Sequence, residues 1–437
     1  MNKKLVALAV AGAFAAPLAV QAQTANVTLY GRLNMDLEFV KGQQVDGSNP
    51  TVNRVSSNSS RFGMRGTESL GGGLNAIFQI EQNVSGDTGN AASSSIASRE
   101  TFVGLQGSWG KVTLGKFLMP QDDIRFIFDN SITLGTSLLS DGAIWGQAQE
   151  SKSTGGFDAR TGNNIRYDTP NYMGFTAAIQ YSTRDSSGDT QNFISCTPAI
   201  GVPTSTGVPT TTYVCPTLAA SAGNIGGGDN GNHLSETRHA NVIGGNVIYV
   251  NGPINAAVSF ERNNKVRQYV SDTAAGAGNP GFDAVHPFFA KDTDWTIAGG
   301  YDFGTIMQGF GLRLGVGYEH TKYDTPTGDL KRDYWGVSAT VPLGGGKFQA
   351  LYGHASNGKG GAADSETVGQ LRHGSDTSAN LWQISYVYSL SPRTLLQTGY
   401  IKINNKDRAS YSFHINPYTI AVGADPSALM FGIVHLF

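Results

Sequence analysis

Residues 27–39 read VTLYGRLNMDLEF, and apolar and polar side chains alternate along this stretch. Such a period of two predicts a β-strand with one apolar and one polar face. The alternation runs well past the roughly 5–6 residues of a typical soluble strand. It matches a tilted strand that crosses a membrane in about 9–11 residues. The stretch therefore predicts a membrane-spanning β-strand.

The same alternation recurs along the chain, at residues 175–182, 294–303, 312–319, 335–343 and 381–388. Short turns are expected at 68–73, 107–110, 169–172, 251–253, 303–305, 343–346 and 389–393. Longer polar loops are expected at 41–57, 85–98, 117–158, 183–238, 266–291, 324–330, 356–377 and 405–427. Short and long connections in alternation predict about 16 strands, with both chain ends on the short-turn side.

A closed barrel is the architecture that lets β-strands cross a membrane with every backbone group paired. We therefore expect an all-β, 16-stranded antiparallel transmembrane barrel over residues 23–437. Barrels of 16–18 strands leave an aqueous channel, whereas about 8 strands leave an interior filled by side chains. The composition agrees, with 57 glycines, 10% aromatic and only 15% charged residues. Glycine suits the turns, and aromatic residues suit the two membrane interfaces.

Residues 1–22 have the features of a secretory signal peptide. Lys3 and Lys4 form the charged region, residues 5–16 the apolar region, and Val20-Gln21-Ala22 a small-residue cleavage site. Removal of this segment takes Lys+Arg from 31 to 29 against 33 Asp+Glu, a net charge of about −4. This balance gives no reason to expect a nucleic-acid partner.

The two cysteines, Cys196 and Cys215, lie in one Thr/Pro/Ala-rich stretch. The compartment outside the cytoplasm is oxidising, so a disulfide between them is expected. Closing this loop would stabilise the chain by about 3 kcal/mol. Two free thiols or an intermolecular bond are the alternatives.

Several further stretches carry a resemblance to a known family: 27–31 (VTLYG), 60–68 (SRFGMRGTE), 100–105 (ETFVGL), 110–116 (GKVTLGK), 164–170 (NIRYDTP) and the terminal Phe437. In this order the chain resembles the general porins of the Gram-negative outer membrane, of the beta-proteobacterial type. The resemblance implies a homotrimer of 16-stranded barrels that passes ions and small hydrophilic solutes passively. It also implies contact with outer-membrane lipid and lipopolysaccharide. Phe437 would be the assembly signal that the β-barrel assembly machinery reads.

In such porins the third loop folds inward and narrows the pore, and here that loop would be 117–158. Its acidic residues are candidates for the constriction, and it also has apolar segments that suit packing against the inner wall. The candidates are Asp122, Asp123 and Asp129, with Asp141 further along. The Pro-Glu-Phe-Gly-Gly segment of enteric porins is absent from this chain.

Basic residues of the wall would face these carboxylates across the pore. The candidates are Arg32, Arg61, Arg65, Arg99 and Arg166. Strand parity turns most of them inward, although the parity around Arg99 is ambiguous. The alternative for each is a position at the rim or at the membrane interface. Opposed charges would create a transverse field, and we expect weak anion selectivity.

No catalytic motif is found, and lumen charges suit a pore, so we expect no enzymatic activity. We expect no cofactor and no metal either. The glycine-rich segment 226–231 is interpreted as a flexible surface stretch. His233 and His239 lack further ligands for a metal site. Two alternative functions stay open: a substrate-selective channel, and a receptor or adhesin whose contact site is the loop around the two cysteines.

Overall fold

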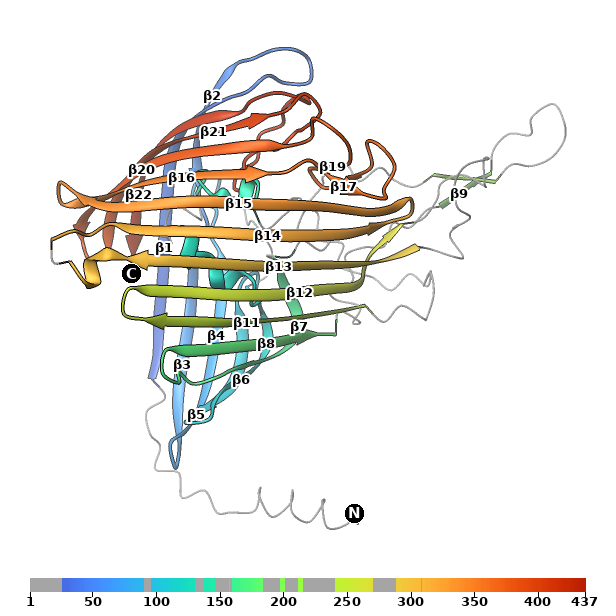
Figure 1. Cartoon of the computed structure of the whole chain (residues 1–437). Coiled ribbons are helices and arrows are strands. Elements are labelled where there is room, and N and C mark those ends of the chain that lie inside the picture. Colours follow the sequence, from blue (N-terminus) through green and yellow to red (C-terminus); the bar gives the residue numbers. More distant parts are fainter. Residues whose placement is uncertain are drawn as a thin grey trace, which may run out of the picture.

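The computed structural model describes residues 26–89, 96–129, 137–145, 157, 159–183, 197–200, 211–214, 240–269, 288–307 and 309–437. The expected signal peptide and both cysteines lie outside these residues. The main feature is a closed antiparallel β-barrel (Figure 1). The sheet contains 18 strand segments. Segments β2 and β3 continue one another along β1, and β17 is only a two-residue segment. The wall is therefore sixteen-stranded, as predicted.

The strands of the wall are β1 (Asn26–Lys41), β2 (Thr51–Ser57) with β3 (Arg61–Gly71), β4 (Leu74–Asn83), β5 (Thr101–Gly107), β6 (Gly110–Leu118), β7 (Arg160–Asp168), β8 (Phe175–Ser182), β11 (Asn241–Asn251), β12 (Ile254–Tyr269), β13 (Phe288–Asp302), β14 (Arg313–Thr325), β15 (Gly328–Leu343), β16 (Gly346–Ala355), β20 (Ala379–Ser391), β21 (Thr394–Asn405) and β22 (Ser427–Leu436). Short segments lie in the longer connections: β9 (Thr197–Ile200), β10 (Thr211–Val214), β17 (Lys359–Gly360), β18 (Thr367–Val368) and β19 (Leu371–Arg372). The helices are η1 (Asp122–Ile124), α2 (Arg125–Asp129), η2 (Asp141–Ala143) and η3 (Phe303–Thr305). None of these helices is long and apolar enough to span a membrane.

Closure occurs between β1 and β22, the first and last strands. The Gly31 amide donates to the Phe437 carbonyl over 2.9 Å, and the Phe437 amide donates back over 3.1 Å. The Phe437 ring covers Gly31 so closely that a Cβ there would lie 2.2 Å from it. A side chain at position 31 would therefore displace the Phe437 ring. The start of β1 and the end of β22 lie together, at the end of the barrel that carries the short turns.

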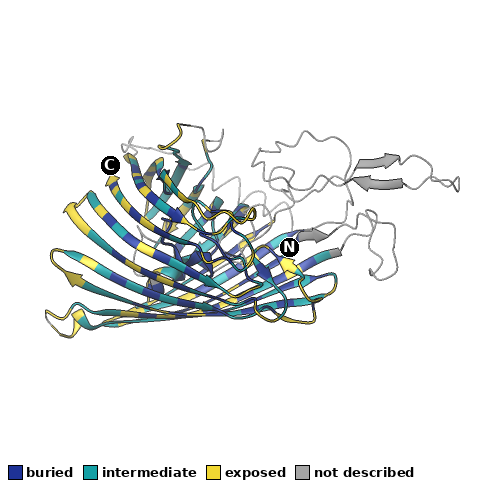
Figure 2. Ribbon diagram, turned by 90° about the horizontal axis from the view of Figure 1, so that it is seen from above, coloured by how far each residue is buried: buried dark blue, intermediate teal, exposed yellow. Residues whose placement is uncertain are grey.

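Side chains alternate between buried and exposed along the strands, as Figure 2 shows. On β14, for example, Leu314, Val316 and Tyr318 are exposed, whereas Glu319 is fully buried. The exposed face is apolar and the buried face is polar, the reverse of a soluble protein. This pattern confirms the strand faces expected from the sequence, because the apolar face of a transmembrane barrel contacts lipid.

Six of the seven expected short turns are present as predicted, whereas the turn expected at 303–305 begins a connection that continues to β14 at Arg313. The loop expected at 41–57 is shorter than predicted, because residues 51–57 form β2. One expected long loop is absent. The loop predicted at 324–330 is wrong, because β14 continues to Thr325 and β15 starts at Gly328. Buried Tyr323 and Leu330 alternate there with charged residues, so the strands extend beyond the apolar band. Gly328, with φ 142°, makes the tight connection possible.

The wall is unequal in height. Strands β5 to β8 have 7, 9, 9 and 8 residues, whereas β12 to β15 have 16, 15, 13 and 16 (Figure 1). The barrel therefore has a low side and a high side.

Candidate functional site

A cluster of arginines lies on the polar face of β1, β3 and the residues before β5. Its centre is Glu81 of β4, which binds Arg99 over 2.5 Å and Arg61 over 3.5 Å. The Tyr30 hydroxyl donates to the same carboxylate over 3.1 Å. Arg99 is 8% exposed, so its ambiguous parity is resolved toward the polar face. Sequence reasoning missed Glu81, although its alternation with Phe78 and Ile80 indicated the inner face.

The other basic candidates of this region share that face. Arg32 pairs in register with Arg61, and its guanidinium donates to the carbonyls of Asn58 and Ser59 over 3.3 and 3.2 Å. Arg32 is buried, with 2% of its surface exposed. Arg65 is exposed, and its guanidinium lies 5.2 Å from the centre of the Tyr30 ring.

Arg166 and Asp123 are in direct contact. Their side chains are 2.6 Å apart, and Arg166 also binds Asp168 of its own strand at 2.7 Å. The Asn246 amide of β11 donates to Asp123 over 3.1 Å. One predicted basic residue and one predicted acidic residue therefore form a local pair and do not face each other across open water.

The remaining candidates are placed differently. Asp122 lies 3.7 Å from Arg125 one turn later, and its side chain is 29% exposed. Asp129 ends α2, and its side chain is not among those described. Arg160 was missed by sequence reasoning. It lies 3.9 Å from Glu100 and keeps 17% side-chain exposure, so it extends the arginine cluster onto β7.

The start of the 117–158 loop docks on buried carboxylates of the high wall. The Gln121 side-chain amide donates to Asp294 of β13 over 3.0 Å and to Glu319 of β14 over 3.2 Å. Arg332 of β15 pairs with Glu319 at 2.8 Å, and neither of these two side chains has any exposed surface. Parity indicated that these charges point inward, but no local pattern could assign Gln121 to them.

Helix α2 continues the docking along the same wall. The Arg313 guanidinium donates to the Phe126 carbonyl over 3.3 Å, and the Ser338 hydroxyl donates to the Phe128 carbonyl. At Gly315 a Cβ would lie 2.9 Å from the Phe128 carbonyl oxygen, so glycine allows this close approach. The described start of the loop thus contacts the polar side of β11 to β15.

The second described part of the loop packs against another long connection. Trp145 stacks on Tyr334 of β15 at 5.5 Å and meets the Phe128 ring edge-on at 4.9 Å. These rings belong to one buried apolar cluster with the connection between β21 and β22. Among its members are Leu138, Leu139, Ala143, Ile144, Ala409, Tyr411, Phe413, Tyr418, Ile420 and Ala424. The stretch 405–427, expected to be a polar loop, therefore has an apolar packing face.

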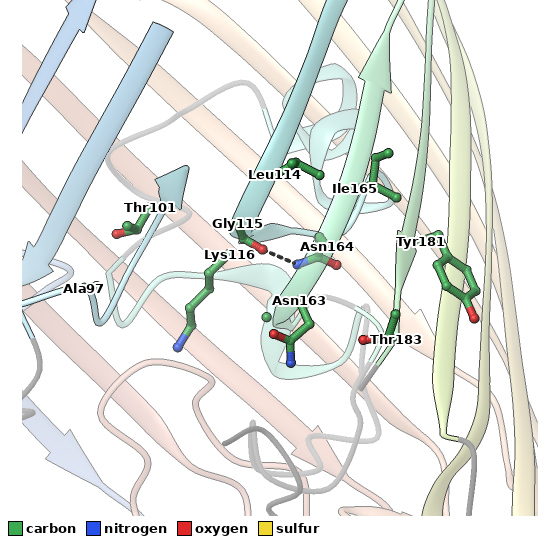
Figure 3. Close-up of a pocket in the computed structure, with 11 residues that line it drawn as sticks. Ala97, Thr101, Leu114, Gly115, Lys116, Asn163, Asn164, Ile165, Tyr181 and Thr183 are labelled. Carbon is green, nitrogen blue, oxygen red and sulfur yellow. Dashed lines mark hydrogen bonds between the residues drawn. The ribbon is translucent and has the colours of Figure 1, made fainter. Parts of the chain in front are cut away.

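A groove of about 760 Å³ lies at the long-loop end of β5 to β8 (Figure 3). Leu114, Ile165 and Tyr181 of its lining are exposed membrane-facing residues. The Asn164 side chain donates to the Gly115 carbonyl over 3.1 Å beside it, where the pairing of β6 with β7 shifts register. The groove opens onto the membrane-facing side of the low wall and is separate from the arginine cluster.

Comparison with known families gives a match to the Gram-negative porins over residues 7–408. The chain belongs to the Gram-negative porin family. Outer membrane porin protein 32 of Delftia acidovorans is 26% identical, and an outer membrane porin protein of Bordetella pertussis is 28% identical. Each of these matches covers 100% of both chains. The family resemblance noted in the sequence is confirmed.

Solved structures support the fold of the porin. The anion-selective porin from Comamonas acidovorans matches with a TM-score of 0.63 and 23% identity, over 94% of this chain and 100% of that one. The trimer form of OmpT from Vibrio cholerae matches with a TM-score of 0.56 and 15% identity, over 94% of this chain and 99% of that one. The molecule is an outer-membrane porin channel and not an enzyme.

Proposed function

We propose that this porin is a general diffusion channel for ions and small hydrophilic solutes, and that its inward-folded third loop narrows the pore. The observation that supports this best is the bridge from Gln121 to Asp294 and Glu319. It fixes the start of the 117–158 loop to polar side chains on the face opposite the lipid. A loop fixed there reduces the open cross-section of a 16-stranded barrel.

The open path would run beside the arginine cluster. Arg61 and Arg160 keep 26% and 17% of their side-chain surface exposed. Arg166 is balanced by Asp123 and Asp168, so the excess positive charge comes from Arg32, Arg61, Arg65, Arg99 and Arg160 against Glu81 and Glu100. Charges within a Debye length of a passing ion, about 10 Å at 0.1 M salt, bias its passage. We therefore propose weak anion selectivity.

The proposed partners are two further copies of the chain, outer-membrane lipid, lipopolysaccharide and the β-barrel assembly machinery. A relative of the same fold is described as a trimer. The low wall of β5 to β8 exposes Val103, Leu105, Leu114, Ile165 and Ile179. These apolar side chains make it a suitable contact face between subunits. Cleavage after residue 22 and a Cys196–Cys215 disulfide are further parts of the proposal.

Phe437 is proposed as the assembly signal. Its ring is 47% exposed on the membrane-facing parity of Leu429, Phe431 and Ile433, and it covers Gly31. Deletion of Phe437 should lower the amount of folded, heat-modifiable barrel in the outer membrane. Unchanged assembly would contradict this role.

Single-channel recording of the purified porin tests the main proposal. The conductance of a general channel should be proportional to the salt concentration. In a KCl gradient its reversal potential should be shifted toward the equilibrium potential of chloride. If one class of solute instead blocks the conductance, and this block saturates with solute concentration, the porin is a substrate-selective channel. Loss of a surface-binding phenotype on deletion of 186–236, with intact conductance, would support the receptor alternative.

A further inference from the structure

A row of cations crosses the membrane-facing side of the barrel at the long-loop end. Strand pairing sets Arg262 of β12 beside Thr293, Thr293 beside Lys322, Lys322 beside Lys331, and Lys331 beside Lys359 of β17. Four of these five neighbouring positions carry a positive charge. They share their parity with the exposed aromatic residues of the same strands, so they point away from the channel.

Such a row has an energetic cost within the barrel. Lys322 and Lys331 are directly opposite one another, and like charges in that position are destabilising. Asp329 partly relieves this cost, because it lies 3.3 Å from Lys322 and 3.1 Å from Lys331. Asp324 lies 3.6 Å from Lys322. The two aspartates thereby hold the two lysines in place and offset their charge.

The cations outnumber the carboxylates of this face. Lys291 is exposed at the next outward position along β13, and Asp333 binds His320 at 2.7 Å and Lys359 at 3.9 Å. Neither Arg262 nor Lys291 has an ionic side-chain partner among the described residues. Among the residues that the structure describes on this face, five Lys and Arg side chains therefore share three carboxylates: Asp324, Asp329 and Asp333.

The opposite ends of the same strands differ. At their short-turn ends the outward positions of β12 to β16 are apolar or aromatic, and within this described part of the chain none is Lys or Arg. They include Ile254, Tyr301, Leu314, Leu343 and Phe348. The positive row is thus specific to one membrane interface and is not a general feature of the barrel ends.

Aromatic rings lie on the membrane-centre side of the row. Trp295 lies 5.3 Å from Tyr318, and Tyr352 lies 5.4 Å from Trp335 and 4.5 Å from Trp382. Aromatic side chains settle at the boundary between acyl chains and headgroups. Cations one step beyond them are therefore at headgroup level, where their side chains reach anionic groups.

We propose that this face of β12 to β17 binds the phosphate groups of the glycolipid of the outer leaflet, with the aromatic residues against its acyl chains. The inference rests on the proposed function in two respects: lipopolysaccharide is a proposed partner, and the long loops face the outside of the cell. Phosphate oxygens provide charge-assisted hydrogen-bond acceptors for Arg262, and for Lys322 and Lys331 beside their aspartates. Each such cation should contribute about fivefold to the affinity.

The test compares one porin variant that lacks three cations of the long-loop end with a control variant that lacks two cations of the short-turn end. One carries Arg262→Gln, Lys322→Gln and Lys331→Gln, and the other carries Lys347→Gln and Arg393→Gln at the short-turn end. The probe is bis-phosphorylated lipid A in detergent micelles, with dephosphorylated lipid A as the reference. The triple variant should bind the phosphorylated probe at least tenfold more weakly than wild type. The control variant should bind it like wild type.

Two results would overturn the proposal. One is unchanged affinity of the triple variant, and the other is equal affinity of the wild type for both probes. If the triple variant does not fold, the salt dependence of wild-type binding still tests the proposal. The affinity of wild type for the phosphorylated probe must fall between 0.1 and 0.5 M salt, because salt screens the attraction between cations and phosphate. Single-channel conductance is recorded in parallel to separate the two proposals. A loss of conductance would count against the diffusion function, whereas a loss of lipid A binding would count only against the present inference.

Discussion

The two sides of the barrel interior are built from the same strand pattern but are filled differently. On the high side, Glu319 and Arg332 have no exposed side-chain surface, and Gln121, at the described start of the 117–158 loop, donates to Glu319. In the arginine cluster, Arg61 of β3 and Arg160 of β7 keep 26% and 17% of their side-chain surface exposed. Strand parity alone points charges inward. Whether an inward charge faces water or is sealed depends on the loops.

This difference separates structural charges from those that act on ions. A buried ion pair such as Glu319–Arg332 is costly to break by removal of one partner, at about 3–5 kcal/mol. Around Glu81, the Arg61 side chain keeps 26% exposure, and we propose that it acts on passing ions, whereas the Arg99 side chain, at 9%, is nearly buried.

The largest expected effect comes from loosening the loop packing on the high side of the barrel. Phe128 is fully buried and packs edge-on against Trp145 and Tyr334. Phe128→Ala should destabilise this packing by about 3–5 kcal/mol. The single-channel conductance should rise as the loop loosens. If the conductance stays at the wild-type value while the variant remains folded, the loop packing on the high side does not limit the conductance of the pore.

A smaller effect is expected from the docking bridge. Gln121→Leu leaves Asp294 and Glu319 without their shared donor, which should cost about 1–3 kcal/mol. Protease cleavage within 117–158 on intact barrels should become faster. Gln44→Leu is the matched control, since Gln44 binds Tyr418 over 2.8 Å in another connection. Equal cleavage of both variants would show that Gln121 does not anchor the loop.

The smallest effect is expected where charges cancel locally. Arg166→Gln together with Asp123→Asn removes one charge of each sign at a distance of 2.6 Å. The reversal potential in a salt gradient should then stay close to that of wild type. A large shift would mean that one member of this pair acts on ions separately. The ion path would then extend beyond the arginine cluster.

Most of the fold could be predicted from local sequence patterns. The alternation in residues 27–39 and its repeats predicted the strand faces, and seven short turns predicted the strand number. The error at 324–330 has a local cause, because charged residues alternate with buried Tyr323 and Leu330 beyond the membrane band. A polar composition there was interpreted as a loop, although the period of two continues.

The candidate site was less predictable. Parity was enough to turn Arg61 and Arg166 inward, and it could also have indicated Glu81. No local pattern relates Gln121 to Asp294 and Glu319, which are 173 and 198 residues away in the sequence. Tyr411 and Phe413, which share a buried cluster with Leu139, lie even further from it in the sequence. These contacts depend on closure of the barrel, which brings distant segments together.

Reversal potential after Arg61→Gln with Arg99→Gln tests the central claim most directly. These substitutions leave Glu81 without its two ion-pair partners and reduce the excess positive charge of the cluster. In a KCl gradient at about 0.01–0.1 M, where the Debye length is about 30–10 Å, selectivity should move toward cations. Arg408→Gln is the control, since Arg408 binds Asp364 at 2.8 Å in the exposed connections. A wild-type reversal potential in the folded double variant would contradict an ion path along the arginine cluster.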